Sequence, residues 1–241
     1  MRSIELLPAL LLVTTLAACT RSEPPAPDAA GPAVAPQVVL PPPPPQAEAR
    51  EARVKSLAKD GSEIRYRVYG SGEPAIVFIH GWSCDSGYWD AQLNEFAARN
   101  TVITVDLAGH GESAANQRLD WSITNFGADV AAAVRNSGRQ RVVLVGSSMG
   151  GAVAQMAMDY GPALAELDLP IIAVNSTGAP TDEAGIRAVE PRFKVVNLQG
   201  VGHFPMLEDP RTFNRVLARI VDEWVALEPQ RNPLSPVPGT R

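Results

Sequence analysis

The sequence of 241 residues predicts an α/β fold with a mostly parallel sheet and helices on both faces. Short apolar runs alternate with longer amphipathic segments along most of the chain. The run at 75–79, Ala-Ile-Val-Phe-Ile, is apolar at every position, as in a strand covered on both faces. The turn signal Asp60-Gly61 between strand-like segments 53–58 and 63–69 predicts a hairpin ahead of the parallel strands.

The remaining elements follow from periodicity and from Gly and Pro boundaries. Further strands are expected at 101–105, 141–145, 170–175 and 193–198, and helices at 88–99, 123–136, 148–160, 182–189 and 209–227. This order places one domain at 53–228, which is long enough to bury a sizeable core.

Residues 1–19 have the pattern of an export signal. Arg2 precedes an apolar run at 6–16 that is too short to span a bilayer comfortably. Residues 16–19, Leu-Ala-Ala-Cys, resemble the bacterial lipoprotein cleavage box, in which the cysteine becomes the lipidated first residue. We therefore expect an exported envelope protein anchored to the membrane through lipidated Cys19. The alternative is a soluble periplasmic protein with an ordinary signal.

Two further segments are expected to be disordered. Residues 20–50 contain ten prolines, and residues 20–52 are expected to form an extended tether. Docking of this Pro-rich segment to a partner is an alternative. The Pro-rich residues 229–241 are expected to form a disordered tail.

Composition excludes several classes of function. The net charge of −5 argues against a nucleic-acid partner. The three histidines, His80, His110 and His203, are too scattered to indicate a metal site, and no cofactor is expected. Only two cysteines are present, so if Cys19 is lipidated, Cys84 has no partner for a disulfide.

Residues 146–150, Gly-Ser-Ser-Met-Gly, match the pattern G-x-S-x-G between a Val-rich strand and an Ala- and Met-rich helix. This is the strand–turn–helix setting of a nucleophile elbow, where a strained turn presents a serine alone above the sheet. The flanking glycines leave room for neighbouring backbone. Ser148 is therefore the predicted nucleophile, and Ser147 is expected to be structural.

Residues 80–82, His-Gly-Trp, follow the strand at 75–79, where the chain turns at the carboxyl edge of the sheet. We expect the amides of Trp82 and Met149 to form an oxyanion hole for Ser148. Trp82 could instead serve only in packing. His80 precedes the nucleophile in the chain and is expected to be a hydrogen-bonded structural residue.

Together with residues 106–113, Asp-Leu-Ala-Gly-His-Gly-Glu-Ser, these motifs resemble the α/β-hydrolase superfamily, and most of all its esterase and lipase-like branch. The resemblance covers about residues 60–227. It implies structural roles for Asp106 and His110, and it implies that His203 is the general base. It also implies hydrolysis of a carboxylic ester through an acyl-enzyme on Ser148.

The sequence departs from the family at the acid of the triad. No carboxylate lies at the usual position near 177–179, and Asp182 is the nearest one. Asp182 is the candidate acid, and the alternative is a helix N-terminal cap.

A second departure is that only residues 161–168 separate the helix at 148–160 from the next strand. One core strand and the cap domain are therefore expected to be missing, which gives either a minimal capless hydrolase or the product of an internal deletion. A capless site suits bulky or interfacial esters. The function from a different class is a non-catalytic envelope lipoprotein that keeps the fold without a competent triad.

Overall fold

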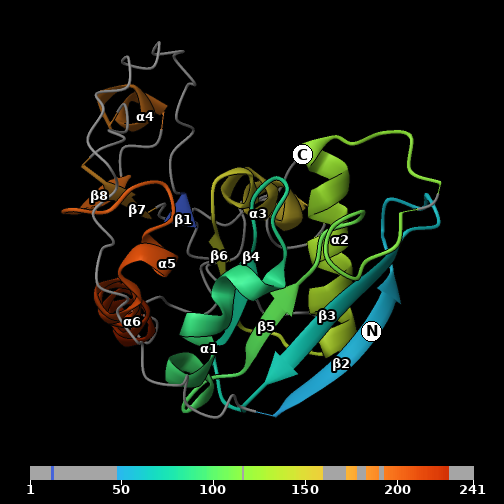
Figure 1. Ribbon diagram of the computed structural model, residues 1–241, viewed down its shortest axis with the longest axis horizontal. Coiled ribbons are helices and arrows are strands. Elements are labelled where there is room, and N and C mark those ends of the chain that lie inside the picture. The colour runs from blue at the N-terminus through green and yellow to red at the C-terminus, as the bar shows by residue number, and fades with distance from the viewer. Residues whose placement is uncertain are drawn as a thin grey trace, which may run out of the picture.

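A computed structural model describes residues 12–13, 48–115, 117–159, 172–177, 183–189 and 193–227. Its main sheet contains β2 (Ala49–Lys55), β3 (Glu63–Tyr69), β4 (Ala75–Ile79), β5 (Val102–Val105) and β6 (Val142–Gly146), together with the two-residue strand β1 (Leu12–Val13). The order across the sheet is β1-β6-β4-β5-β3-β2 (Figure 1). The pairs among β1, β6, β4 and β5 are parallel, and β3 joins the sheet antiparallel to β5. The expected mostly parallel sheet is thus confirmed.

The hairpin of β2 and β3 is antiparallel, with Ala49 opposite Tyr69 and Lys55 opposite Glu63. The strand β2 begins at Ala49, so the last four residues assigned to the tether belong to the sheet. Ala49–Lys55 pairs along its whole length with β3. The rest of the expected tether before residue 48 and the expected tail at 229–241 lie outside the described residues.

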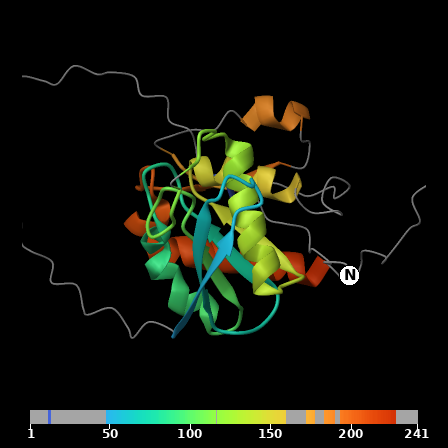
Figure 2. The same cartoon turned by 90° about the vertical axis from the view of Figure 1, so that its right-hand side faces the viewer.

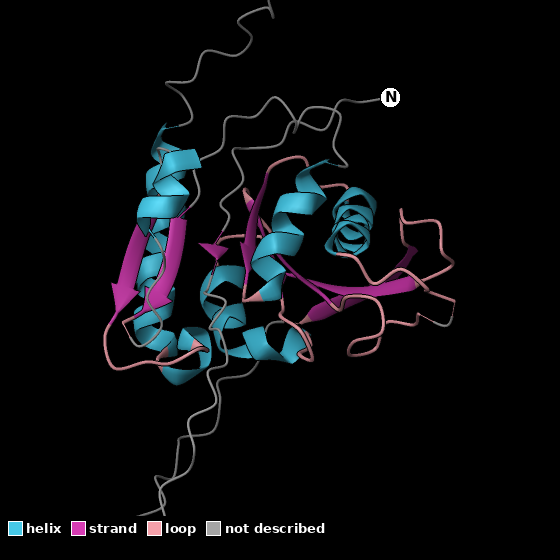
Figure 3. Ribbon diagram, turned by 90° about the horizontal axis from the view of Figure 1, so that it is seen from above, coloured by secondary structure: helices cyan, strands magenta, loops and turns pink. Residues whose placement is uncertain are grey.

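The strands β7 (Ile172–Ser176) and β8 (Lys194–Leu198) form a separate parallel pair (Figure 3). Every residue of β7 is buried. Within the apolar run of the expected signal, Leu12–Val13 pairs with β6 and lies beside β7. The rest of the signal, including Cys19, lies outside the described residues. The interval 160–171, where one core strand and the cap are expected to be missing, also lies outside them.

Helices cover both faces of the sheet. The helical elements are η1 (Ser86–Trp89), α1 (Asp90–Ala97), α2 (Ile123–Ser137), α3 (Met149–Asp159), α4 (Glu183–Val189), α5 (Pro205–Glu208) and α6 (Pro210–Leu227). One core cluster joins α2 and α3 to the sheet, and a second joins α1 and α6 to its other face. In Figure 2, α6 crosses behind the β2–β3 hairpin while α2 lies nearer the viewer.

Local sequence signals set the ends of the helices. Ser122 caps α2 by accepting a hydrogen bond from the Asn125 amide at 3.3 Å, and Gly138 ends it with φ 71°. Asp209 accepts a hydrogen bond from the Thr212 amide at 3.1 Å in the first turn of α6, where Pro210 is the first residue. The short helix α5 falls in a segment for which the sequence predicted no element.

Candidate active site

Ser148 stands at a sharp turn between β6 and α3. Its φ of 53° is in the left-handed region, which is strained for a residue with a side chain. A Cβ on Gly146 would lie 2.2 Å from the Gly150 carbonyl oxygen, and one on Gly150 would lie 2.4 Å from the Ile79 oxygen. Only glycine fits at either position, so the turn has the geometry that the motif predicts. Ser147 is buried, whereas Ser148 is partly exposed.

The loop after β4 lies directly against Ser148. A Cβ on Gly81 would be 3.2 Å from the Ser148 Cβ and 3.8 Å from its Oγ. The loop is closed by Cys84, whose amide donates to the Gly81 oxygen at 3.3 Å and whose Sγ donates to the Trp82 oxygen at 3.4 Å. Among the described residues, the amides of Trp82 and Met149 donate no backbone hydrogen bond outside the helices and strands. Their role as oxyanion-hole donors stays a prediction.

His80 is fixed in its neutral form beneath this loop. The Leu107 amide donates to Nε2 at 3.1 Å, so Nδ1 carries the proton and donates to the Gly81 oxygen at 2.8 Å. Burial lowers the pKa of His80 to about 4, although the hydrogen bond to Gly81 acts in the opposite direction. Both ring nitrogens are bonded to backbone, so His80 holds two loops together as a structural residue.

Asp106 is likewise bonded to protein on all sides. Its carboxylate accepts from Arg65 at 2.9 Å, from the Ser86 amide at 2.8 Å and from the Glu112 amide at 3.1 Å. Burial alone would raise the pKa of Asp106, but these donors outweigh it and lower the pKa. His110 bonds through Nδ1 to the Ala108 oxygen at 3.0 Å. These bonds anchor both residues to neighbouring backbone.

His203 lies in the loop between β8 and α5 and is partly exposed. Its ring packs edge-on against Phe204, with centroids 4.8 Å apart. Glu208, at the end of α5, accepts hydrogen bonds from the amides on either side of His203, those of Gly202 at 2.5 Å and Phe204 at 3.0 Å. These two amides, and to a smaller extent the charge of His203, lower the pKa of Glu208.

Sequence reasoning missed Glu208. The only feature of the sequence that could have indicated it is the spacing: Glu208 comes five residues after His203 and six after Gly202. A Cβ on Gly202 would lie 3.1 Å from Glu208 Oε1, so a glycine at 202 gives the carboxylate its close approach. The candidate acid Asp182 lies outside the described residues. The described residues at the end of β7, 172–177, contain no carboxylate.

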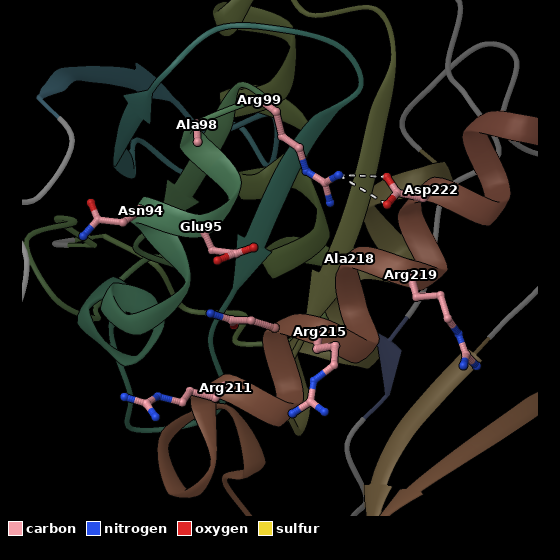
Figure 4. A pocket seen from close by; sticks show the side chains of 10 residues that line it. Asn94, Glu95, Ala98, Arg99, Arg211, Arg215, Ala218, Arg219 and Asp222 are labelled. Atoms are coloured by element: carbon pink, nitrogen blue, oxygen red, sulfur yellow. Dashed lines mark hydrogen bonds and ion pairs between the residues drawn. The ribbon is translucent and has the colours of Figure 1, made fainter.

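Away from these residues, a groove of about 770 Å³ lies between α1 and α6 (Figure 4). It is lined mainly by charged side chains, and Arg99 binds Asp222 across it at 3.1 Å. No candidate catalytic residue lines it. Among the described residues there is no cluster of His, Cys, Asp and Glu that could hold a metal ion, and no helix long and apolar enough to cross a membrane.

Comparison with known proteins agrees with this architecture. The thermophilic esterase from Thermogutta terrifontis superposes with a TM-score of 0.61 at 16% identity, over 73% of this chain and 99% of that one. Residues 76–193 match the Alpha/beta hydrolase family. The fold is the α/β-hydrolase fold. The matched segment includes Trp82, Ser148, Met149 and Asp182, whereas His203 lies beyond it.

Curated relatives match over a shorter stretch. A non-heme haloperoxidase from Rhodococcus erythropolis is 44% identical over 39% of this chain. A bifunctional esterase/perhydrolase from Acinetobacter calcoaceticus is 41% identical, also over 39% of the chain. Each alignment covers 34% of the relative, so the chain spans about a third of the length of these two relatives.

Proposed function

We propose that this protein is a serine hydrolase that cleaves carboxylic esters, without a cofactor, through an acyl-enzyme on Ser148. The observation that carries the proposal is the elbow itself: Ser148 has φ 53° between two glycines that admit no side chain. Strain of this kind persists only where the surrounding structure enforces it, and it is typical of functional residues. The esterase among the curated relatives supports the same class of reaction.

In the proposed mechanism, His203 takes the Ser148 proton as Oγ bonds to the ester carbonyl carbon. The amides of Trp82 and Met149 stabilise the negative oxygen of the tetrahedral intermediate. His203 then gives the proton to the departing alcohol, and the C–O bond to that alcohol breaks. Water repeats the sequence on the acyl-enzyme, which releases the carboxylic acid and restores Ser148. Asp182 is the proposed acid that orients His203.

The competing proposal is a non-catalytic protein that keeps the α/β-hydrolase fold. It is favoured by the absence of a carboxylate from the described end of β7, residues 172–177. A fluorophosphonate probe separates the two proposals. We expect the wild type to be labelled and Ser148→Ala to remain unlabelled, while both show the same circular dichroism spectrum. Absence of labelling on folded wild-type protein would overturn the enzyme proposal.

We also propose export and anchoring to the membrane through lipidated Cys19, supported by the Leu-Ala-Ala-Cys box at 16–19. Processing at this box would remove Leu12–Val13, so β1 would belong to the unprocessed chain alone. Metabolic labelling with a radioactive fatty acid tests this proposal. The wild type should incorporate label and partition with membranes, and Cys19→Ser should do neither. Incorporation in Cys19→Ser would contradict the assignment.

A further inference from the structure

A groove of about 390 Å³ lies at the rim of the candidate active site, lined by Trp82, Ser83, Gly109, His110 and Trp121. No side chain in this set is an acid, a lysine or an arginine. Three of the five large apolar side chains exposed in the described residues, Trp82, Leu119 and Trp121, come from the two loops that form it. Trp82 is 60% exposed and Trp121 is 44% exposed, so both present aromatic surface to solvent.

The groove adjoins the loop that carries one proposed oxyanion-hole amide. Gly81 lies against Ser148, and Trp82, the next residue, forms one wall of the groove. The groove therefore begins one residue along the chain from the glycine that contacts Ser148. Ser83, at the same rim, has a left-handed φ of 57°.

His110 and Trp121, two of the residues that line the groove, are held in place by neighbouring rings and backbone. The His110 ring meets Trp82 at 5.6 Å and Phe126 at 5.8 Å between centroids, in both cases edge to face. Trp121 lies against Gly109, where an added Cβ would be 2.9 Å from the indole ring. This contact is possible because Gly109, with φ 72°, carries no side chain.

Arg118 packs against Trp121, the residue that forms the wall of the groove opposite Trp82. Its guanidinium lies 5.9 Å from the centroid of Trp121 and 5.5 Å from that of Phe126. It is held there by ion pairs to Asp129 at 2.7 Å and Asp60 at 2.6 Å, with no exposed side-chain surface of its own. The wall is thus pre-organised, which reduces the entropy lost when a ligand binds.

We propose that this groove binds the aromatic ring of an ester substrate, so that the protein prefers esters with an aryl group near the scissile bond. The proposal rests on the proposed ester hydrolysis at Ser148. A flat ring can stack on or meet edge-on the rings of Trp82, His110 and Trp121, whereas a saturated ring of similar volume gains only apolar contact. The absence of acids, lysines and arginines from the lining favours a neutral ring.

The test uses two matched pairs of esters, with the ring on the alcohol side or on the acyl side. Benzyl acetate is compared with cyclohexylmethyl acetate, and methyl phenylacetate with methyl cyclohexylacetate. We expect a preference for the aryl member in kcat/KM in at least one pair. Trp121→Ala should reduce that preference by about 3- to 10-fold, because aromatic pairs contribute this much beyond their area. Trp121→Phe should retain most of it.

Leu119→Ala is the matched control, because Leu119 lies in the same loop, is 93% exposed and does not line the groove. An unchanged preference in Trp121→Ala, or an equal loss in Leu119→Ala, would overturn the proposal. Ser148→Ala provides a readout without turnover. Benzyl acetate should quench its tryptophan fluorescence saturably, and adding Trp121→Ala should abolish this quenching. If the wild type is not labelled by the fluorophosphonate and Ser148→Ala still shows saturable quenching, the hydrolase is refuted and the ring site stands. If the wild type is labelled and Ser148→Ala shows no quenching, the ring site alone is refuted.

Discussion

The region that carries the candidate nucleophile and the region that carries the candidate base are stabilised differently. The front region, residues 48–159, contains all four buried charged side chains among the described residues: Arg65, Asp106, Arg118 and Asp129. The rear region, which comprises β7, α4, β8, α5 and α6, holds its ion pairs at the surface, as between Arg219 and Glu223. Directional bonds therefore fix the surroundings of Ser148 more tightly than those of His203.

The rear region docks on the front region mainly by apolar packing. The helix α6 contributes Phe213, Leu217 and Trp224 to the cluster that covers one face of the sheet. A buried polar link is Gln92, whose side-chain amide donates to the Met206 oxygen at 3.0 Å and to Asn214 at 2.9 Å. Apolar contact is non-directional. The position of His203 relative to Ser148 thus depends on packing and on the local clamp that Glu208 provides.

The largest expected effect concerns the partner of His203. Asp182→Asn should lower kcat by about three to four orders of magnitude if Asp182 orients the base, because a triad without its acid stabilises the wrong imidazole tautomer. Ester hydrolysis and the circular dichroism spectrum, measured together, separate a catalytic loss from unfolding. An unchanged rate in Asp182→Asn would reassign Asp182 to capping α4.

Glu208→Gln is the matched charge-removing variant in the rear region. Its side-chain oxygen can still accept from one of the amides of Gly202 and Phe204, so we expect a fall in kcat of roughly tenfold or less, given the weaker neutral hydrogen bonds. If kcat falls by orders of magnitude in Glu208→Gln and is unchanged in Asp182→Asn, Glu208 is the acid that acts on His203.

The next prediction concerns the buried ion pair of the front region, Arg118 with Asp129. The Asp129 carboxylate accepts from Arg118 at 2.7 Å, Ser56 at 2.6 Å and the Ala108 amide at 3.1 Å. Asp129→Ala removes one of the two carboxylates that neutralise the buried Arg118. The free energy of unfolding should therefore fall by about 3–5 kcal/mol. Urea denaturation followed by fluorescence measures it. A change below about 1 kcal/mol would show that the front region does not depend on this pair.

Much of the front region could be predicted because its signals are local. The apolar run of β4, the Asp60-Gly61 turn and the glycines around Ser148 each determine their own backbone. The buried ion pairs could not be predicted, since Arg65 and Asp106 are 41 residues apart and meet only when β3 pairs with β5. In the rear region β7, α4, β8 and α6 were predicted within two residues, but α5 was not predicted. Glu208, at the end of α5, was missed because nothing in the sequence shows that its carboxylate bonds back onto the His203 loop.

A pH dependence of stability is also expected to originate in the front region. The pKa of His80 is lowered from 6.5 to about 4, so the unfolded chain binds a proton at a higher pH than the folded protein. The contribution of His80 to stability should therefore fall by about 3 kcal/mol as the pH drops from 6.5 to about 4. Thermal unfolding across this range measures the loss. His80→Gln cannot titrate and should lose this component; an identical slope in the variant would assign the dependence to other groups.

The smallest expected effect tests whether charge holds the two regions together. Arg99 of α1 and Asp222 of α6 form an ion pair at 3.1 Å with side chains 45% and 60% exposed (Figure 4). Exposed pairs are screened by water, so a double-mutant cycle with Arg99→Ala and Asp222→Ala should give a coupling of about 0.2–1 kcal/mol. The coupling should vanish near 1 M salt, where the Debye length is about 3 Å. A salt-resistant coupling above about 2 kcal/mol would mean that α6 is docked by charge as well as by packing, and the contrast between the regions would no longer hold.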